Sequence, residues 1–217
     1  MLRQTGQWAL LIMMAVGTAT AFAPDREARA GSFDLYRFVN PGSWAVGVEP
    51  EFILTHGAGF GGNLKFTYGA TELNNLTGII GTGGGDHKFR VGGNFTFDII
   101  PDIDKQPGIG IALQAIYYRI AVPMATSGVA AQTVAQLELT AIPYLHKAFK
   151  TAAGTEFEPF VTFPVGLSLN GGQYLGLTSL AVGSMFKSSE HFRYVVELGI
   201  AINHTDSYIS GGVVYYQ

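Results

Sequence analysis

The stretch Phe192–Ile202, FRYVVELGIAI, has the clearest alternation of apolar and polar residues in this chain. Its even-numbered positions are all apolar, whereas its odd-numbered positions include Arg193 and Glu197. A β-strand directs alternate side chains to opposite faces, so as a strand this stretch has one apolar face and one mixed, charged face. A helix, with a period of about 3.6 residues, would scatter the two charges around its circumference. The pattern therefore predicts a strand whose wide apolar face suits contact with lipid.

The same alternation recurs along most of the chain. It predicts strands at residues 44–54, 60–68, 74–82, 87–99, 108–120, 132–145, 156–167, 174–187, 192–202 and 207–217. Short connections rich in turn-forming residues separate most of these segments. We therefore predict an all-β fold, an antiparallel up-and-down transmembrane β-barrel of about ten strands, with eight strands as the alternative. An even count closes the sheet with both termini on one side, and strands of this length cross a bilayer when tilted.

The composition narrows the possible functions. Charged residues make up 13% of the 217 residues, against about 25% in an average soluble domain. The chain has no Cys, which excludes disulfides, thiolate metal sites and thiol nucleophiles. The formal net charge is -3 and there is no basic cluster, so nucleic acid is not an expected partner.

The N-terminal residues 1–30 have the pattern of an export signal. Arg3 precedes the apolar segment WALLIMMAVG at residues 8–17, which is too short to span a bilayer as a helix. We expect cleavage after Ala30, with Ala21 as the second choice and an uncleaved membrane anchor as the alternative. Residues 31–43 lack clear periodicity and are predicted to form a leader or a small plug, followed by the barrel at 44–217.

The distribution of large and charged side chains predicts which face of the barrel turns outward. A soluble barrel places its apolar face inside, whereas a membrane barrel inverts this arrangement because lipid contacts the wall. The apolar faces are crowded with Phe, Tyr, Leu and Ile, and the mixed faces carry Gly, Ala, Thr and charges. A narrow lumen needs small residues and paired charges. We therefore expect the apolar faces to contact lipid; the alternative is a secreted soluble barrel that binds an apolar ligand.

The signal, the ten alternating strands and a chain that ends on the strand GGVVYYQ (211–217) resemble one broad family. These features, over residues 44–217, are similar to the small outer-membrane β-barrel proteins of Gram-negative bacteria, the OmpA/OmpW-like class. Members usually end in an aromatic residue, whereas here Gln217 follows two Tyr. The resemblance implies a monomer in the bacterial outer membrane, with membrane lipids, lipopolysaccharide and the outer-membrane assembly machinery as partners.

The mixed faces supply a set of charges that we expect to point into the lumen. This predicted lumen network comprises Glu49, Glu51, Lys65, Lys88, Arg90, Asp98, Glu138, Glu156, Glu158, Arg193 and Glu197. It can line a small, porin-like, mildly cation-preferring pore, because acids outnumber bases, or it can plug the barrel with paired charges. Aromatic residues are predicted at the two membrane interfaces: Trp44, Tyr68, Phe186, Phe192 and Tyr215 at one, and Phe60, Phe89 and Tyr174 at the other.

The first predicted hairpin suggests a specific ion pair within this network. If the hairpin is centred on Gly57, Glu49 lies directly opposite Lys65 on the mixed face. A shift of one residue would place Lys65 opposite an apolar side chain and turn over the faces of one strand. The alternation therefore predicts a Glu49–Lys65 pair inside the barrel.

The sequence HTDS at residues 204–207 brings together His, Asp and Ser, which could serve an outer-membrane lipid or peptide hydrolase. The alternative is a polar turn between two strands, which we favour. The other His residues are dispersed and show no metal-ligand spacing. We therefore expect no enzymatic activity, no metal and no cofactor, and a structural or narrow-channel role.

Overall fold

The computed structural model describes residues 39–55, 58–83, 87–122, 132–152, 154–170 and 172–217. The predicted signal at residues 1–30, and residues 31–38 of the predicted leader, lie outside the described residues. Within the described ranges, no helix is long and apolar enough to cross a membrane.

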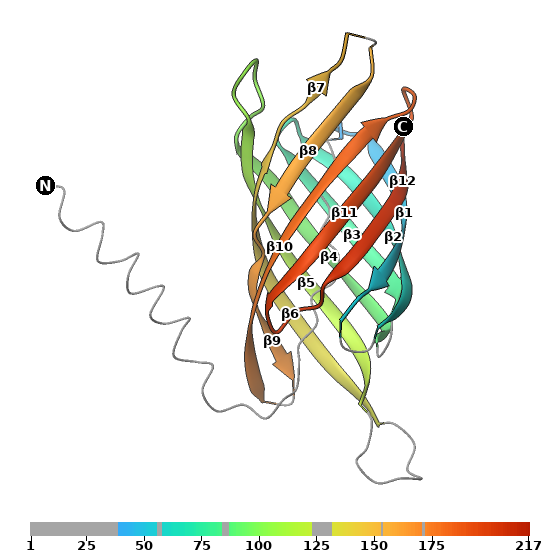
Figure 1. Ribbon diagram of the computed structural model, residues 1–217, viewed down its shortest axis with the longest axis vertical. Coiled ribbons are helices and arrows are strands. Elements are labelled where there is room, and N and C mark those ends of the chain that lie inside the picture. The colour runs from blue at the N-terminus through green and yellow to red at the C-terminus, as the bar shows by residue number, and fades with distance from the viewer. Residues whose placement is uncertain (1–38, 56–57, 84–86, 123–131, 153, 171) are drawn as a thin grey trace, which may run out of the picture.

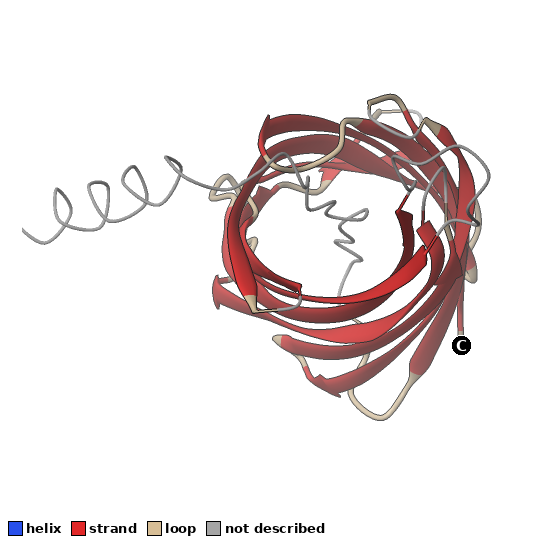
Figure 2. Cartoon of the chain, turned by 90° about the horizontal axis from the view of Figure 1, so that it is seen from below, coloured by secondary structure: helices blue, strands red, loops and turns tan. Residues whose placement is uncertain are grey.

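The described chain folds into one antiparallel sheet that closes on itself (Figures 1 and 2). Its strands are β1 (Trp44–Ile53), β2 (Gly59–Thr71), β3 (Asn74–Thr82), β4 (His87–Ile100), β5 (Gly108–Val122), β6 (Gln132–His146), β7 (Phe149–Lys150), β8 (Glu156–Thr162), β9 (Val165–Asn170), β10 (Gln173–Lys187), β11 (Phe192–Asn203) and β12 (Tyr208–Tyr216). Each wall strand pairs with its neighbours in the sequence, and β12 pairs with β1 to close the ring.

Two of these strands form one strand of the wall. β8 and β9 both pair with β6 on one side and β10 on the other, and they are separated only by Phe163 and Pro164. The two-residue β7 pairs with β8 alone. The wall therefore has ten strands, as the sequence predicts. Figure 1 places the start of β1 and the end of β12 at the same end of the barrel, which we call the terminal rim.

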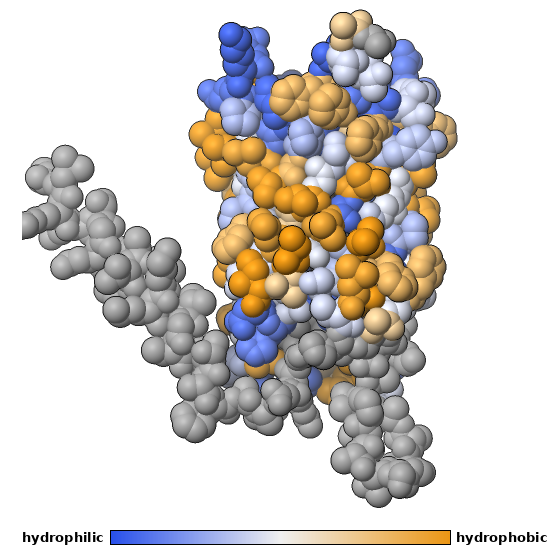
Figure 3. All heavy atoms as spheres, viewed as in Figure 1, coloured by the Kyte–Doolittle hydropathy of each residue, from blue (hydrophilic) through white to orange (hydrophobic). Residues whose placement is uncertain are grey.

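The faces of the wall are inverted relative to a soluble protein. On β1, Val48 and Phe52 are 58% and 49% exposed on the outside, whereas Glu49 and Glu51 beside them are 1% exposed on the inside. Figure 3 shows the same arrangement as a concentration of hydrophobic residues over the middle of the wall, with hydrophilic residues at its upper end. So large an exposed apolar surface is typical of a membrane barrel and does not fit the soluble alternative.

The register of the first hairpin differs from the prediction. Glu49 lies opposite Asn63, and Lys65 lies opposite Gly47, so the predicted pairing of Glu49 directly with Lys65 was wrong by two residues. A shift of two leaves every side chain on its original face, because the side-chain period of a strand is two. The alternation of the sequence therefore predicts the faces correctly but cannot distinguish the two registers.

Inward-facing rings lie over glycines of the neighbouring strand. Tyr208 is paired with Gly199 across β12 and β11, and a Cβ at Gly199 would lie 2.0 Å from a ring carbon of Tyr208. Phe160 lies in the same way over Gly183, where a Cβ would lie 2.4 Å from the ring. A glycine in a strand often marks such a close approach. These rings fill lumen space that other side chains at the paired positions would occupy.

Candidate functional site: the lumen

Charged and polar side chains gather at two levels inside the barrel. The central network consists of Glu49, Glu51, Lys65, Arg90, Tyr118, Glu197 and Tyr208, from β1, β2, β4, β5, β11 and β12. The rim network, near the terminal rim, consists of Asp98, Asp102, Tyr144, His146, Lys147 and Glu158. The two differ in burial and in their partners.

Adjacent strands supply two of the central contacts. Lys65 Nζ on β2 donates to Glu49 Oε2 on β1, two residues along from the position directly opposite. The predicted ion pair is therefore present as a diagonal contact, which a long side chain can reach. On β12, the Tyr208 hydroxyl donates to Glu197 Oε1 of β11.

A third central contact connects strands that are not neighbours. Arg90 Nη2 on β4 donates to Glu51 Oε2 on β1 at 3.1 Å, passing β2 and β3 on the inside of the barrel. Gly81 on β3 leaves room for it, because a Cβ at that position would lie 2.9 Å from Arg90 Nε. Arg90 and Glu51 therefore bridge the lumen.

The side chains of these ion pairs are enclosed inside the barrel. The side chains of Lys65 and Glu49 are 1% and 2% exposed, and those of Arg90 and Glu51 are 2% and 1% exposed. A water-filled passage at this height would leave charged lining residues accessible to water. Instead they are enclosed and paired, as buried charges must be to avoid a large desolvation penalty.

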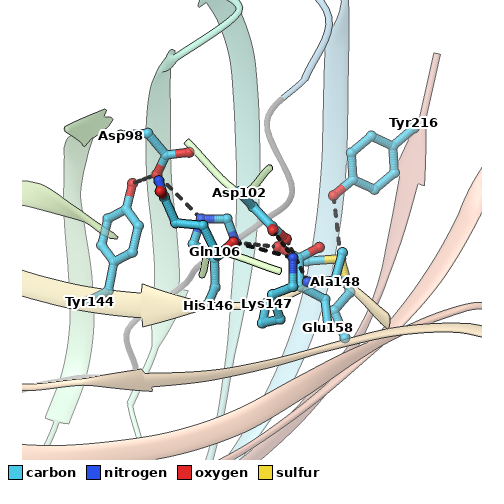
Figure 4. A network of polar contacts seen from close by, with 10 residues as sticks. Asp98, Asp102, Gln106, Tyr144, His146, Lys147, Ala148, Glu158 and Tyr216 are labelled. Carbon is cyan, nitrogen blue, oxygen red and sulfur yellow. Dashed lines mark hydrogen bonds and ion pairs between the residues drawn. The ribbon is translucent and has the colours of Figure 1, made fainter. Parts of the chain in front are cut away.

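The rim network surrounds His146, the last residue of β6 (Figure 4). His146 Nδ1 lies 2.7 Å from Glu158 Oε1, and its Nε2 lies 3.4 Å from Asp98 Oδ1. The Tyr144 hydroxyl donates to the same Asp98 oxygen at 2.8 Å. The imidazole thus connects carboxylates of β4 and β8 across the end of the barrel.

The loop between β4 and β5 is fastened to this network through Asp102. Lys147 Nζ donates to Asp102 Oδ1 and to the Asp104 carbonyl, and the Ala148 amide donates to Asp102 Oδ2 at 2.7 Å. Burial alone would raise the pKa of Asp102, but the hydrogen bonds from Ala148 and Lys147 outweigh it and lower the pKa below its usual value. These contacts hold the loop against the β6–β8 connection.

A cavity of about 300 Å³ opens beside the rim network. Its polar lining consists of Glu72, Asp98, Asp102, His146 and Glu158. Although carboxylates predominate, no group of three or more His, Asp or Glu side chains within the described ranges is placed to hold a metal ion.

The structure divides the predicted lumen network into separate groups. Glu49, Glu51, Lys65, Arg90 and Glu197 belong to the central network, and Asp98 and Glu158 to the rim network.

The remaining predicted charges are Glu138, Glu156, Arg193 and Lys88. Glu138 is buried and accepts from Gln136 Nε2 at 2.7 Å. Glu156 Oε2 lies 3.2 Å from Lys187 at the rim, and Arg193 Nε is buried and has no hydrogen-bond partner. Lys88 lies on β4, but its side chain is not among those described.

The site also contains residues that the sequence did not indicate: Tyr118, Tyr144, His146 and Tyr208. Tyr144 and His146 share the inward parity of Glu138 on β6, which is a signal that could have identified them. Tyr208 could be recognised only by its pairing with Gly199, and that requires the register of β11 and β12. Tyr118 lies on β5, where both faces are largely apolar and alternation is uninformative.

The predicted interface aromatics lie at strand ends. Trp44, Phe192 and Tyr215 meet at the terminal rim, with ring centroids 5.9 Å apart for Trp44–Tyr215 and 5.3 Å for Phe192–Tyr215. Tyr68 and Phe186 lie near the same rim, towards the ends of β2 and β10, and Phe60, Phe89 and Tyr174 lie near the starts of β2, β4 and β10 at the opposite end. Phe60 and Tyr174 are 71% and 72% exposed on the outer wall.

The HTDS segment forms the turn between β11 and β12. The Thr55 hydroxyl donates to Asp206 Oδ1 at 2.7 Å, and the Ala201 amide donates to Ser207 Oγ at 3.0 Å. His204 has a φ of 48°, in the left-handed region that turns use. These contacts connect the turn to the ends of β1 and β11, as expected for a polar turn.

No family model matches this chain, and no curated protein matches it. Among solved structures, an outer-membrane channel from Pseudomonas putida F1 is similar over 91% of this chain and 100% of its own, with 10% identity and a TM-score of 0.49. The β domain of the Bordetella autotransporter BrkA is similar over 80% and 98%, with 11% identity and a TM-score of 0.46. A de novo designed transmembrane β-barrel is similar over 82% and 98%, with 13% identity and a TM-score of 0.38. Membership of the OmpA/OmpW-like class stays a prediction.

Proposed function

We propose that this protein is a monomeric barrel of the bacterial outer membrane with a structural role, and that the central network keeps its lumen closed. The observation that carries the proposal is the enclosure of the Arg90–Glu51 and Lys65–Glu49 pairs, whose side chains are 1–2% exposed. The apolar outer wall supports a membrane location, since closed antiparallel barrels are the β-structures that span bilayers. Its partners are then membrane lipids and lipopolysaccharide on the wall, and the assembly machinery during insertion.

Ion flux from liposomes tests this proposal. Refolded wild-type protein should release trapped potassium no faster than empty liposomes. The double variant E51A/R90A should release it, because it removes both partners of the contact that bridges the lumen. Removing both partners avoids leaving an uncompensated buried charge, so the barrel should still fold. K105A, at an exposed residue of the β4–β5 loop, is the matched control and should behave as wild type.

A second candidate, a narrow cation-preferring channel, is favoured by the charges of the central network. Glu49, Glu51 and Glu197 give three carboxylates against two cations, Lys65 and Arg90. An excess of carboxylates along a pore attracts cations. If wild-type protein releases potassium, and its reversal potential in a KCl gradient has the sign of cation selectivity, this second function replaces the first.

A further inference from the structure

Arg193 is a cation of the terminal rim that the described ion pairs do not use. It is the second residue of β11, and its side chain is on the inner face, with the same parity as Val195 and Glu197. Its guanidinium carbon lies 5.2 Å from the centre of the Tyr216 ring, a cation–π distance. Its Nε is enclosed and has no hydrogen-bond acceptor. By contrast, Lys65, Arg90 and Lys187, also on the inner face, each lie within 3.2 Å of a carboxylate oxygen.

A second positive charge lies directly across the sheet from Arg193. Lys187 on β10 is its cross-strand partner, and like charges at directly opposed positions destabilise a sheet. Glu156 lies 3.2 Å from Lys187 and 3.7 Å from Lys150, so this carboxylate is shared between two lysines. Lys187 and Arg193 therefore hold two like charges at directly opposed positions, and an anion bound between them would offset their repulsion.

Arg193 lines two cavities at the rim. One, of about 240 Å³, is lined by Asn40, Lys187, Glu190, Arg193, Tyr216 and Gln217. The other, of about 200 Å³, is lined by Arg193 together with the apolar side chains of Phe149, Phe157 and Met185 and the charged side chains of Lys150, Glu156 and Glu158. The larger cavity brings both cations to one space, and its single acidic side chain, Glu190, is exposed to solvent. It has room for a small oxyanion in contact with Arg193.

We propose that Arg193, assisted by Lys187, binds a phosphate group at the terminal rim. The planar guanidinium presents paired N–H donors that match the oxygens of phosphate, and the Tyr216 ring supports the guanidinium in position. The phosphate comes either from free inorganic phosphate or from the headgroup of a phospholipid in the adjacent leaflet. The site does not depend on whether the lumen conducts.

The test is NMR of the full chain, labelled with ¹⁵N-arginine and refolded in alkyl maltoside micelles, which contain no phosphate. Titration with inorganic phosphate at constant ionic strength should shift the Nε–Hε resonance of Arg193 saturably. The resonance is assigned by its disappearance in R193K, which keeps the charge and the long side chain. Calorimetry should show phosphate binding weakened by about tenfold or more in R193M, the size expected for losing a charge-assisted hydrogen bond. K187M should weaken it less, and K105M not at all.

A parallel sample in nanodiscs containing phosphatidylglycerol distinguishes the two sources. A shift of the Arg193 resonance in these nanodiscs, without added phosphate and relative to the micelles, assigns the site to a lipid headgroup. A shift only with inorganic phosphate assigns it to the free anion. The proposal is overturned if the Arg193 resonance moves in neither sample, or if R193M and R193K bind phosphate as tightly as wild type.

Discussion

The Glu49–Lys65 pair offers a direct test of how the barrel interior is stabilised. Replacing one partner, as in E49Q or K65M, leaves the other charge in an enclosure where both side chains are at most 2% exposed. Stranding a buried charge costs about 3–5 kcal/mol, and we expect each single variant to lose free energy of unfolding in this range. The double variant E49Q/K65M leaves no stranded charge of the pair. Its loss should be smaller than the sum of the single losses by about 1 kcal/mol or more.

Urea unfolding from lipid vesicles, followed by tryptophan fluorescence, measures this coupling. The matched control is the pair K65M and E156Q, on β2 and β8, which are not neighbours in the sheet and should give additive losses. Strictly additive losses for E49Q and K65M would mean that the two side chains do not interact in the membrane-inserted barrel.

The same hairpin shows why the sequence predicts the wall but not the site. Alternation in Phe192–Ile202 reveals the faces because a lipid-facing strand keeps a strict period of two. That period is unchanged by a shift of two residues, so the true pairing of Glu49 with Asn63 leaves no trace in the pattern. The alternation also does not show how far along the barrel axis a side chain lies. Arg193 and Glu197 share a face of β11, yet one lies at the rim and the other in the central network.

Three further predictions follow from the wall, the rim and the membrane interface. G199A should destabilise the barrel by about 1–3 kcal/mol in urea, because its Cβ would meet the Tyr208 ring, whereas G78A, with nothing within 4 Å, should have little effect; equal losses would contradict the packing. The pKa of Asp102 is lowered in the folded state, so its carboxylate stabilises the fold above the usual value of 3.8 and this stabilisation is lost as the pH falls through the folded pKa. Below about pH 4, the free energy of unfolding of the wild type should therefore fall more steeply with pH than that of D102N. Parallel pH profiles of the two proteins would show that the Asp102 carboxylate does not stabilise the fold. In protein without the predicted signal segment, the fluorescence of Trp44 should be quenched most by lipids labelled near the headgroup. Stronger quenching by lipids labelled at the bilayer centre would contradict the location of the terminal rim at the membrane interface.

Single-channel recording in planar bilayers tests whether the buried ion pairs close the lumen. Wild-type protein, inserted with its fold verified, should show no steady conductance at moderate voltage, because Arg90 and Glu51 bridge the lumen and are 2% and 1% exposed. E51A/R90A should give discrete, long-lived openings under the same conditions. A steady conductance of wild-type protein equal to that of the double variant would contradict the claim that these side chains close the barrel.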